Sequence, residues 1–269
     1  MKLDFYIPRK LEGLSPMIWE QTTDSPQNWK MLPDGHFDLI FKFDEPWTVY
    51  SEKYTSKSYN PTEHFCFLSG LQTKPINVSF SRTHVMGIRL NAIAVKLIFD
   101  LPCCDLVDWA IDGRDILPNK MGMIENVIQE MPDFYPRAIW LENFVHSIIK
   151  DNAEFNVAVR LSKLLDQIVT NKVNGQPFDI CSLTGYSRMH TYRIFKDWFG
   201  LSPSKAIAMK QFIFSLEQMH QEHETLTQVA LTNGYYDQPH FVRVFKEYAE
   251  MTPGQYLKNR THIVGQLPF

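Results

Sequence analysis

The amino-acid sequence predicts a multi-domain α+β protein, and three observations lead to that class. The chain has 269 residues, which at about 150 residues per domain suggests two domains. Short β-rich stretches separated by turn residues occupy the first part of the chain, whereas helical periodicity dominates the rest. With 44% hydrophobic and 21% charged residues, the composition is that of an ordinary globular protein and excludes a disordered chain.

The amino-terminal domain, residues 1–150, is expected to be a β-barrel or sandwich with trailing helices. The pair Asp34-Gly35 permits a positive φ, so a turn is predicted before the strand candidate His36–Phe43. Short strands at close spacing are typical of antiparallel barrels and sandwiches. The further strand candidates are 47–54, 64–71, 76–82 and 84–90.

Helices are predicted to follow these strands. Residues 93–101 form a short helix that ends near Pro102, and the pattern is helical again from Met121 to Lys150. The polar stretch 150–156 is expected to be a linker. Nearly everything after it has the periodicity of an all-α domain.

Two eleven-residue segments match each other at a separation of fifty positions. Arg193–Pro203 reads RIFKDWFGLSP, and Arg243–Pro253 reads RVFKEYAEMTP. A repeat at a fixed period indicates two copies of one supersecondary unit. The unlike pairs are Phe199 with Ala249 and Gly200 with Glu250.

The second copy has the signals of a helix-turn-helix unit. Thr225–Asn233 is predicted as a short helix, Gly234 as the turn, and Asp237 as the N-cap of the second helix. Pro239 fits the first turn of that helix, where a missing N–H costs little. Two helices joined by a short turn containing glycine form this motif. The predicted buried face of the second helix comprises Phe241, Val244, Phe245 and Tyr248.

The first copy has the same plan with a turn one residue shorter. Phe178–Thr184 is predicted as its first helix, Gly185-Tyr186 as its turn and Ser187 as the N-cap. Between the copies, Ser204–Gln221 is predicted as one long helix that holds the two units about one DNA turn apart. The predicted buried face of the second helix comprises Thr191, Ile194, Phe195 and Trp198.

The outer face of each second helix is predicted to enter a DNA major groove. Charge agrees with this, because residues 156–260 hold 12 basic and 9 acidic side chains while the remainder holds 15 and 21. The predicted DNA-binding residues of the first unit are Ser187, Arg188, Met189, His190, Tyr192, Arg193 and Lys196. Those of the second unit are Gln238, Pro239, His240, Val242, Arg243 and Lys246.

Roles follow from chemistry and position. Arg188 and Gln238 lead their helices and are predicted to read bases, since Arg suits guanine and Gln suits adenine. Arg193 and Arg243 are expected to contact phosphates. Two roles stay open for His190 and His240, namely contact with DNA or packing against the turn. The side chains expected at thymine methyl groups are Met189, Pro239, Tyr192 and Val242.

The second unit closely resembles the AraC/XylS family of bacterial transcription regulators. The pattern A-x-x-x-G-Y-Y-D-Q-P-H-F-x-R-x-F-K followed by M-T-P-G-Q-Y spans Ala230–Tyr256. The resemblance covers about Phe155 to Arg260 and implies a DNA-binding domain, residues 156–260, of two helix-turn-helix units joined by a helix. The segments LPDGHFDLIF, GIRLNAIAVKLIFDLP and DLVDWAIDGRDIL resemble a sensor domain that is often fused to it. In the family such domains are small β-barrels that bind effectors, mediate dimerisation, or do both.

The predicted function is that of a sequence-specific DNA-binding transcription regulator. Control is expected through a small-molecule effector or through dimerisation of the amino-terminal domain, and the effector-binding residues are unknown. Operator or promoter DNA, an effector, a second copy in a homodimer and RNA polymerase are the expected partners. Whether the protein is an activator or a repressor stays open. Two alternatives are a DNA-repair alkyl-transfer protein on the same module and a ligand-independent DNA-binding protein.

No catalytic residue, cofactor or metal site is predicted. The four cysteines show no C-x-x-C spacing, so they are expected to be buried or half-buried thiols. Asp34, His36 and Asp38 alternate without the H-x-H cluster that a metal-binding barrel would need. No apolar run reaches the ~18 residues of a membrane span. The start of the chain lacks a secretory apolar core, so a cytoplasmic location is expected.

Overall fold

The computed structural model describes residues 1–43, 48–50, 65–80, 82–170, 185–220 and 225–268. Two expectations lie wholly or partly outside these ranges. They concern the first helix of the first unit, Phe178–Thr184 with Cys181, and parts of the strand candidates 47–54, 64–71 and 76–82. Within the described ranges, no helix combines the length and the hydropathy that a membrane span requires.

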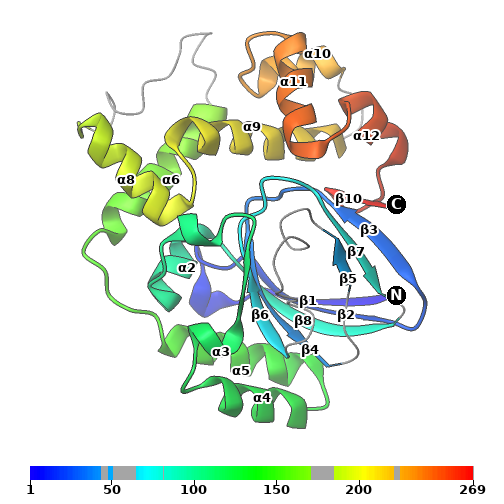
Figure 1. The fold of residues 1–269 in the computed structure, drawn as a ribbon, viewed down its shortest axis with the longest axis vertical. Helices are drawn as coiled ribbons and strands as arrows, with labels where there is room; N and C mark the ends of the chain where they lie inside the picture. Colours follow the sequence, from blue (N-terminus) through cyan, green and yellow to red (C-terminus); the bar gives the residue numbers. More distant parts are fainter. Residues whose placement is uncertain (44–47, 51–64, 81, 171–184, 221–224, 269) are drawn as a thin grey trace.

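Two antiparallel sheets form the amino-terminal part of the described chain (Figure 1). One has six strands in the order β1-β2-β8-β4-β6-β9, and the other has four in the order β10-β3-β7-β5. The predicted antiparallel barrel or sandwich is confirmed. The strands are β1 (Lys2–Tyr6), β2 (Met17–Thr23), β3 (Gln27–Met31), β4 (Phe37–Lys42), β5 (Thr48–Tyr50), β6 (Cys66–Ser69), β7 (Ile76–Phe80), β8 (Thr83–Leu90), β9 (Ala110–Asp112) and β10 (Gln266–Pro268).

Alternation along β4 separates the two faces of the six-stranded sheet. Phe37, Leu39 and Phe41 are buried in the main core, whereas Ile40 belongs to a smaller cluster on the opposite face. Successive side chains of a strand point to opposite faces, so the two sets belong to two layers. The main core also includes side chains of three covering helices, which are α2 (Ala92–Phe99), α4 (Met121–Glu130) and α5 (Phe134–Ser147).

The region 121–150, predicted as helical, consists of two helices. Met131 is extended, with φ −82° and ψ 120°, because the proline that follows disfavours the helical conformation there. After α5 the chain crosses the predicted linker and enters α6 (Phe155–Thr170). Shorter helical elements are η1 (Arg9–Leu11), η3 (Cys103–Leu106) and α3 (Gly113–Ile116).

Within the described residues after α6, the elements that precede the final strand are helices, as predicted. The long helix α9 (Pro203–His220) lies between the two units in Figure 1. Proline is favoured at the first position of a helix, which explains where α9 begins. The remaining helices are α8 (Arg188–Phe199), α10 (Leu226–Thr232), α11 (Gln238–Ala249) and α12 (Pro253–Asn259).

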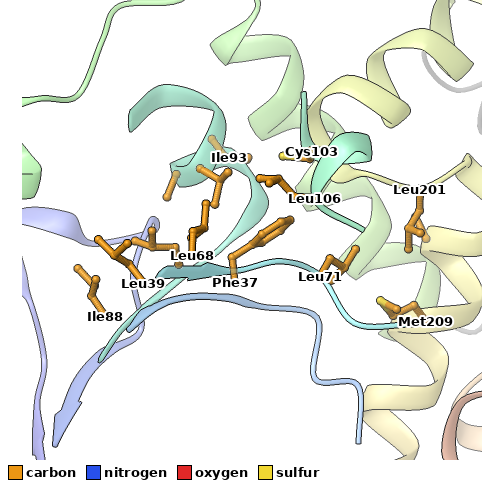
Figure 2. Close-up of a cluster of buried hydrophobic side chains, with 14 of the residues drawn as sticks. Phe37, Leu39, Leu68, Leu71, Ile88, Ile93, Cys103, Leu106, Leu201 and Met209 are labelled. Atoms are coloured by element: carbon orange, nitrogen blue, oxygen red, sulfur yellow. The ribbon is translucent and has the colours of Figure 1, made fainter. Parts of the chain in front are cut away.

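The apolar core continues from the sheet into the helical part of the molecule. Figure 2 shows side chains of the six-stranded sheet, such as Phe37, followed by Leu106 and then by Leu201 and Met209. The last strand, β10, also returns to the amino-terminal part and pairs with β3. Leu32 N donates to Gly265 O at 2.8 Å beside that pairing. Both the shared core and the strand pairing therefore join the helical part to the sheets.

Candidate nucleic-acid interface

The second unit is held in shape by short-range hydrogen bonds. At the start of α10, Thr225 forms a capping box in which its side chain accepts from Gln228 N and the Gln228 side chain accepts from Thr225 N. Gly234 has φ +73°, which a residue with a side chain rarely adopts. Asp237 caps α11 by accepting from His240 N at 2.7 Å. The predicted turn at Gly234 and the predicted cap at Asp237 are present in this unit.

The inner face of α11 packs against α10 and α9. All four predicted core residues, Phe241, Val244, Phe245 and Tyr248, are buried. The ring of Phe212 on α9 lies 5.2 Å from Phe245 and 5.1 Å from Tyr248, between ring centroids. Burial raises the pKa of Tyr248 to about 12, so its phenol stays neutral. The packing fixes which side of α11 faces outward.

The outer face of α11 is open to solvent. Gln238, Arg243 and Lys246 are exposed, and Val242 is half-buried. These side chains and Pro239 line a shallow open groove along the helix. A second hollow extends the surface to the turn at Tyr236, whose side chain is 80% exposed. The hydrogen-bond donors and cations of Gln238, Arg243 and Lys246 therefore lie beside the apolar side chains of Pro239 and Val242.

Two side chains of this face also make contacts within the unit. Gln238 Oε1 accepts a hydrogen bond of 2.9 Å from Thr227 Oγ1 on α10. His240 Nδ1 accepts from Tyr236 N at 3.3 Å, and the ring packs edge-on against Tyr235. These contacts of His240 support the turn, and its contact with DNA stays a prediction.

The first unit repeats the design in its described part. Gly185 has φ +71°, and Ser187 caps α8 by accepting from His190 N at 3.3 Å. The His190 ring packs edge-on against Tyr186, as its counterpart does in the second unit. Arg188, Met189, Tyr192 and Arg193 are exposed on the outer face. The four predicted core residues, Thr191, Ile194, Phe195 and Trp198, are buried.

The outer face of α8 is linked to other parts of the chain. Arg193 Nη2 donates to Glu154 Oε1 at 3.2 Å, and Trp198 Nε1 donates to Glu154 Oε2 at 3.1 Å. The hydrogen bond from Trp198, followed by the charge of Arg193, lowers the pKa of Glu154. Lys96 on α2 pairs with Asp197 at 3.2 Å. Lys196 is half-buried, whereas Lys246 in the second unit is exposed.

The carboxy-terminal end of α11 touches the amino-terminal part. Lys74 Nζ donates to Glu247 O at 2.8 Å, and Lys30 Nζ pairs with Glu250 Oε2 at 3.3 Å. Cations at this end of a helix are favourable because the last carbonyl groups carry partial negative charge. The contacts leave the amino-terminal end of α11 and its outer face open.

The surroundings of the described cysteines favour the thiol over the thiolate form. Burial is the first cause that raises the pKa of Cys66, of Cys103 and of Cys104 above the ordinary thiol value. A thiol with a raised pKa holds little of the reactive thiolate. No group of three His, Cys, Asp or Glu side chains that could hold a metal ion occurs within the described ranges.

Sequence families match both parts of the chain. A family described as "Helix-turn-helix domain" matches residues 180–259, which include α8 to α12. A family described as "Domain of unknown function (DUF6597)" matches residues 9–112, which include most of the two sheets.

Two curated relatives align with the carboxy-terminal part. The "Probable transcription factor PqrA" of Proteus vulgaris is 28% identical over 82 residues, which cover 30% of this chain and 67% of that protein. An "Uncharacterized HTH-type transcriptional regulator" of Haemophilus influenzae is 30% identical over 80 residues, which cover 30% of this chain and 27% of that protein. The chain therefore spans about a quarter of the length of the second relative.

A solved structure extends the likeness to both parts. The crystal structure of a lysine-to-alanine variant of apo ToxT from Vibrio cholerae strain SCE256 covers 90% of this chain and 96% of its own, with a TM-score of 0.50 and 14% sequence identity. At that identity the likeness concerns the fold alone. It agrees with a β-rich part followed by a helical part.

Three sets of side-chain contacts at the interface were not part of the sequence-based prediction. The bond from Thr227 to Gln238, the pairing of Glu154 with Arg193, and the seating of Lys30 and Lys74 at the end of α11 were not predicted. The last two join positions far apart in the chain, so no local pattern reveals them. The bond from Thr227 to Gln238 could have been anticipated, because a hydroxyl in the first turn of α10 faces the start of α11.

Proposed function

Because this chain belongs to the AraC/XylS family of transcription regulators, and is a sequence-specific DNA-binding regulator, we propose that the outer faces of α8 and α11 carry its contacts with operator DNA. One observation supports this most directly. Two helices with equivalent sequences are capped in the same way, buried on the same side and open on the other. Such helices suit insertion into successive major grooves.

The contacts divide between bases and phosphates. Arg188 and Gln238 at the helix starts read base edges, and the lysines and arginines neutralise phosphates. For the two histidines we favour the packing role. The proposed contact residues are Ser187, Arg188, Met189, Tyr192, Arg193 and Lys196 in the first unit, and Gln238, Pro239, Val242, Arg243 and Lys246 in the second.

Control is assigned to the amino-terminal domain. Lys30, Lys74 and strand β10 connect it to the second unit, and Lys96 connects it to the first. An effector or a dimer contact that shifts these groups changes how the two helices are presented to DNA. The regulator then recruits or blocks RNA polymerase. Calorimetry of the full chain with metabolite pools separates an effector-controlled protein from a ligand-independent one.

In-vitro selection of a DNA site by the full chain tests the proposal. We expect a bipartite site, since each unit contributes one helix. Loss of selection at one position in Arg188→Ala and at another in Gln238→Ala would assign each half to a unit. A protein that selects no sequence and binds no duplex at low salt would overturn the proposal. Lys120→Ala, at the start of α4 and at the opposite end of the molecule (Figure 1), serves as the charge-loss control.

A further inference from the structure

The side chain of Gln238 is held from within its own unit. Its Oε1 accepts a 2.9 Å hydrogen bond from Thr227 Oγ1, eleven positions earlier and on the other helix of the motif. Both residues are exposed, so the contact is no by-product of core packing. Because its amide is already hydrogen-bonded, Gln238 can approach a base in fewer orientations.

The backbone on both sides of this bond is fixed. Thr227 is the second residue of α10, between Thr225 and Gln228, which are tied by a capping box with bonds of 3.2 and 2.8 Å. On the other side, Asp237 immediately precedes Gln238 and caps α11. Side chains anchored to two such helix starts meet in one geometry, and this is the condition for precise presentation of a polar group.

The bond determines which end of the amide remains for DNA. Adenine is read by an amide that donates to N7 and accepts from N6–H₂ through its carbonyl oxygen. Thr227 directs that oxygen toward α10, so the Nε2 group, which carries two N–H donors, is the end presented to the groove. Guanine offers O6 and N7 as acceptors, and thymine offers O4.

We propose that Thr227 is a positioning residue that makes Gln238 a hydrogen-bond donor, so that the base it reads is a keto base, with guanine preferred. This inference rests on the proposed function and replaces the adenine preference expected for a free Gln. Adenine and cytosine present amino groups in the major groove, and those would face the N–H donors of Gln238. The specificity of the second unit is thus set partly by a residue that does not touch DNA.

The experiment uses the full chain and proceeds in two steps. Selection with wild type and Gln238→Ala identifies the base position that depends on Gln238. Duplexes carrying each of the four bases there are then titrated with wild type, Thr227→Val and Thr227→Ser. Valine keeps the shape and the similar helix propensity of threonine without the hydroxyl, and serine restores the hydroxyl.

We expect wild type and Thr227→Ser to bind a keto base over an amino base by roughly tenfold, which is within the range of one good base contact. In Thr227→Val the amide turns freely, so the preference falls and adenine gains, while affinity for the rest of the site is retained. Selection of adenine or cytosine by wild type overturns the inference. An unchanged preference in Thr227→Val also overturns it.

Different outcomes would contradict the proposed function and the role of Thr227. If wild type selects no DNA sequence at all, the proposed function fails and takes the inference with it. If a site is selected but Gln238→Ala leaves the motif unaltered, Gln238 reads no base, so the inference alone fails. Gln238→Glu should reverse the base preference. A carboxylate only accepts hydrogen bonds, so this variant should prefer cytosine, which donates from its amino group.

Discussion

The two helix-turn-helix units have the same local design and different surroundings. Ser187 and Asp237 occupy the same cap position, and Gly185 and Gly234 the same left-handed turn. The outer faces differ, however. Arg193 in the first unit is paired with Glu154, whereas Arg243 in the second lies exposed beside an open groove.

The repeated sequence determines the geometry of each helix, whereas the surrounding elements determine whether its arginine is available to bind a phosphate. An arginine that is already paired must leave its carboxylate before it binds a phosphate. The second unit therefore carries more of the DNA affinity in our proposal, because Arg243 has no such pair to leave within the described residues.

The largest expected effect is on the buried anchors of the two second helices. Trp198 is fully buried and hydrogen-bonded to Glu154, and Tyr248 is buried with a 3.3 Å bond to Lys205 O. Trp198→Ala should lower the free energy of unfolding by about 4 kcal/mol, and Tyr248→Ala by about 3 kcal/mol. Urea denaturation followed by circular dichroism measures both. The exposed Tyr192→Ala is the control, and a larger loss in Tyr248→Ala would reverse the ranking of the units.

A smaller effect is expected where each second helix ends. The unlike pair of the repeat, Gly200 and Glu250, adopts the same left-handed conformation, with φ of +76° and +57°. Gly200→Ala should cost about 2 kcal/mol, because a left-handed alanine is strained. Its Cβ would also lie 3.0 Å from Cys103 O.

Glu250→Gly should instead gain up to about 1 kcal/mol, since glycine relieves that strain. The gain is reduced by loss of the pair with Lys30. Thermal unfolding of the two variants provides the measurement. A loss of stability in Glu250→Gly would mean that the pair with Lys30 outweighs the relief of backbone strain.

DNA affinity should show the difference between the arginines. Arg243→Ala is expected to weaken operator binding about tenfold and to reduce the slope of log K against log salt by about one. Arg193→Ala should weaken it about threefold, because Arg193 must first leave Glu154. Salt titrations by fluorescence anisotropy test this, with Lys120→Ala as the control. Equal losses in the two arginine variants would contradict the comparison.

The smallest effect is expected for Glu154→Gln, which removes the negative charge of the pair between Glu154 and Arg193. The folded-state pKa of Glu154 is below its ordinary value, so its contribution to stability is present at neutral pH and is lost as pH falls through the carboxyl range. The side chain is 37% exposed, so we expect less than about 1 kcal/mol. The stability gap between wild type and variant should close in acid. A gap that widens there would refute the assignment.

Parts of the fold were predictable because their signals are local. The strand candidates led to β4, β5, β6, β7 and β8, but β1, β2, β3, β9 and β10 were not singled out. Strand β10 shows the reason, since its three residues acquire a partner only when Met31 and its neighbours lie beside them. The DNA-contact residues and the domain boundaries stay predictions.

The caps, the turns and the buried stripe of each second helix could be predicted from local sequence. These depend on residues one to four positions apart, whose hydrogen bonds and helical spacing are set by local backbone geometry. The pairing of Arg193, the hydrogen bond from Thr227 to Gln238 and the pairing of β10 with β3 could not be predicted in this way. Those contacts join separate elements, and their partners meet only after the apolar core has brought the elements together.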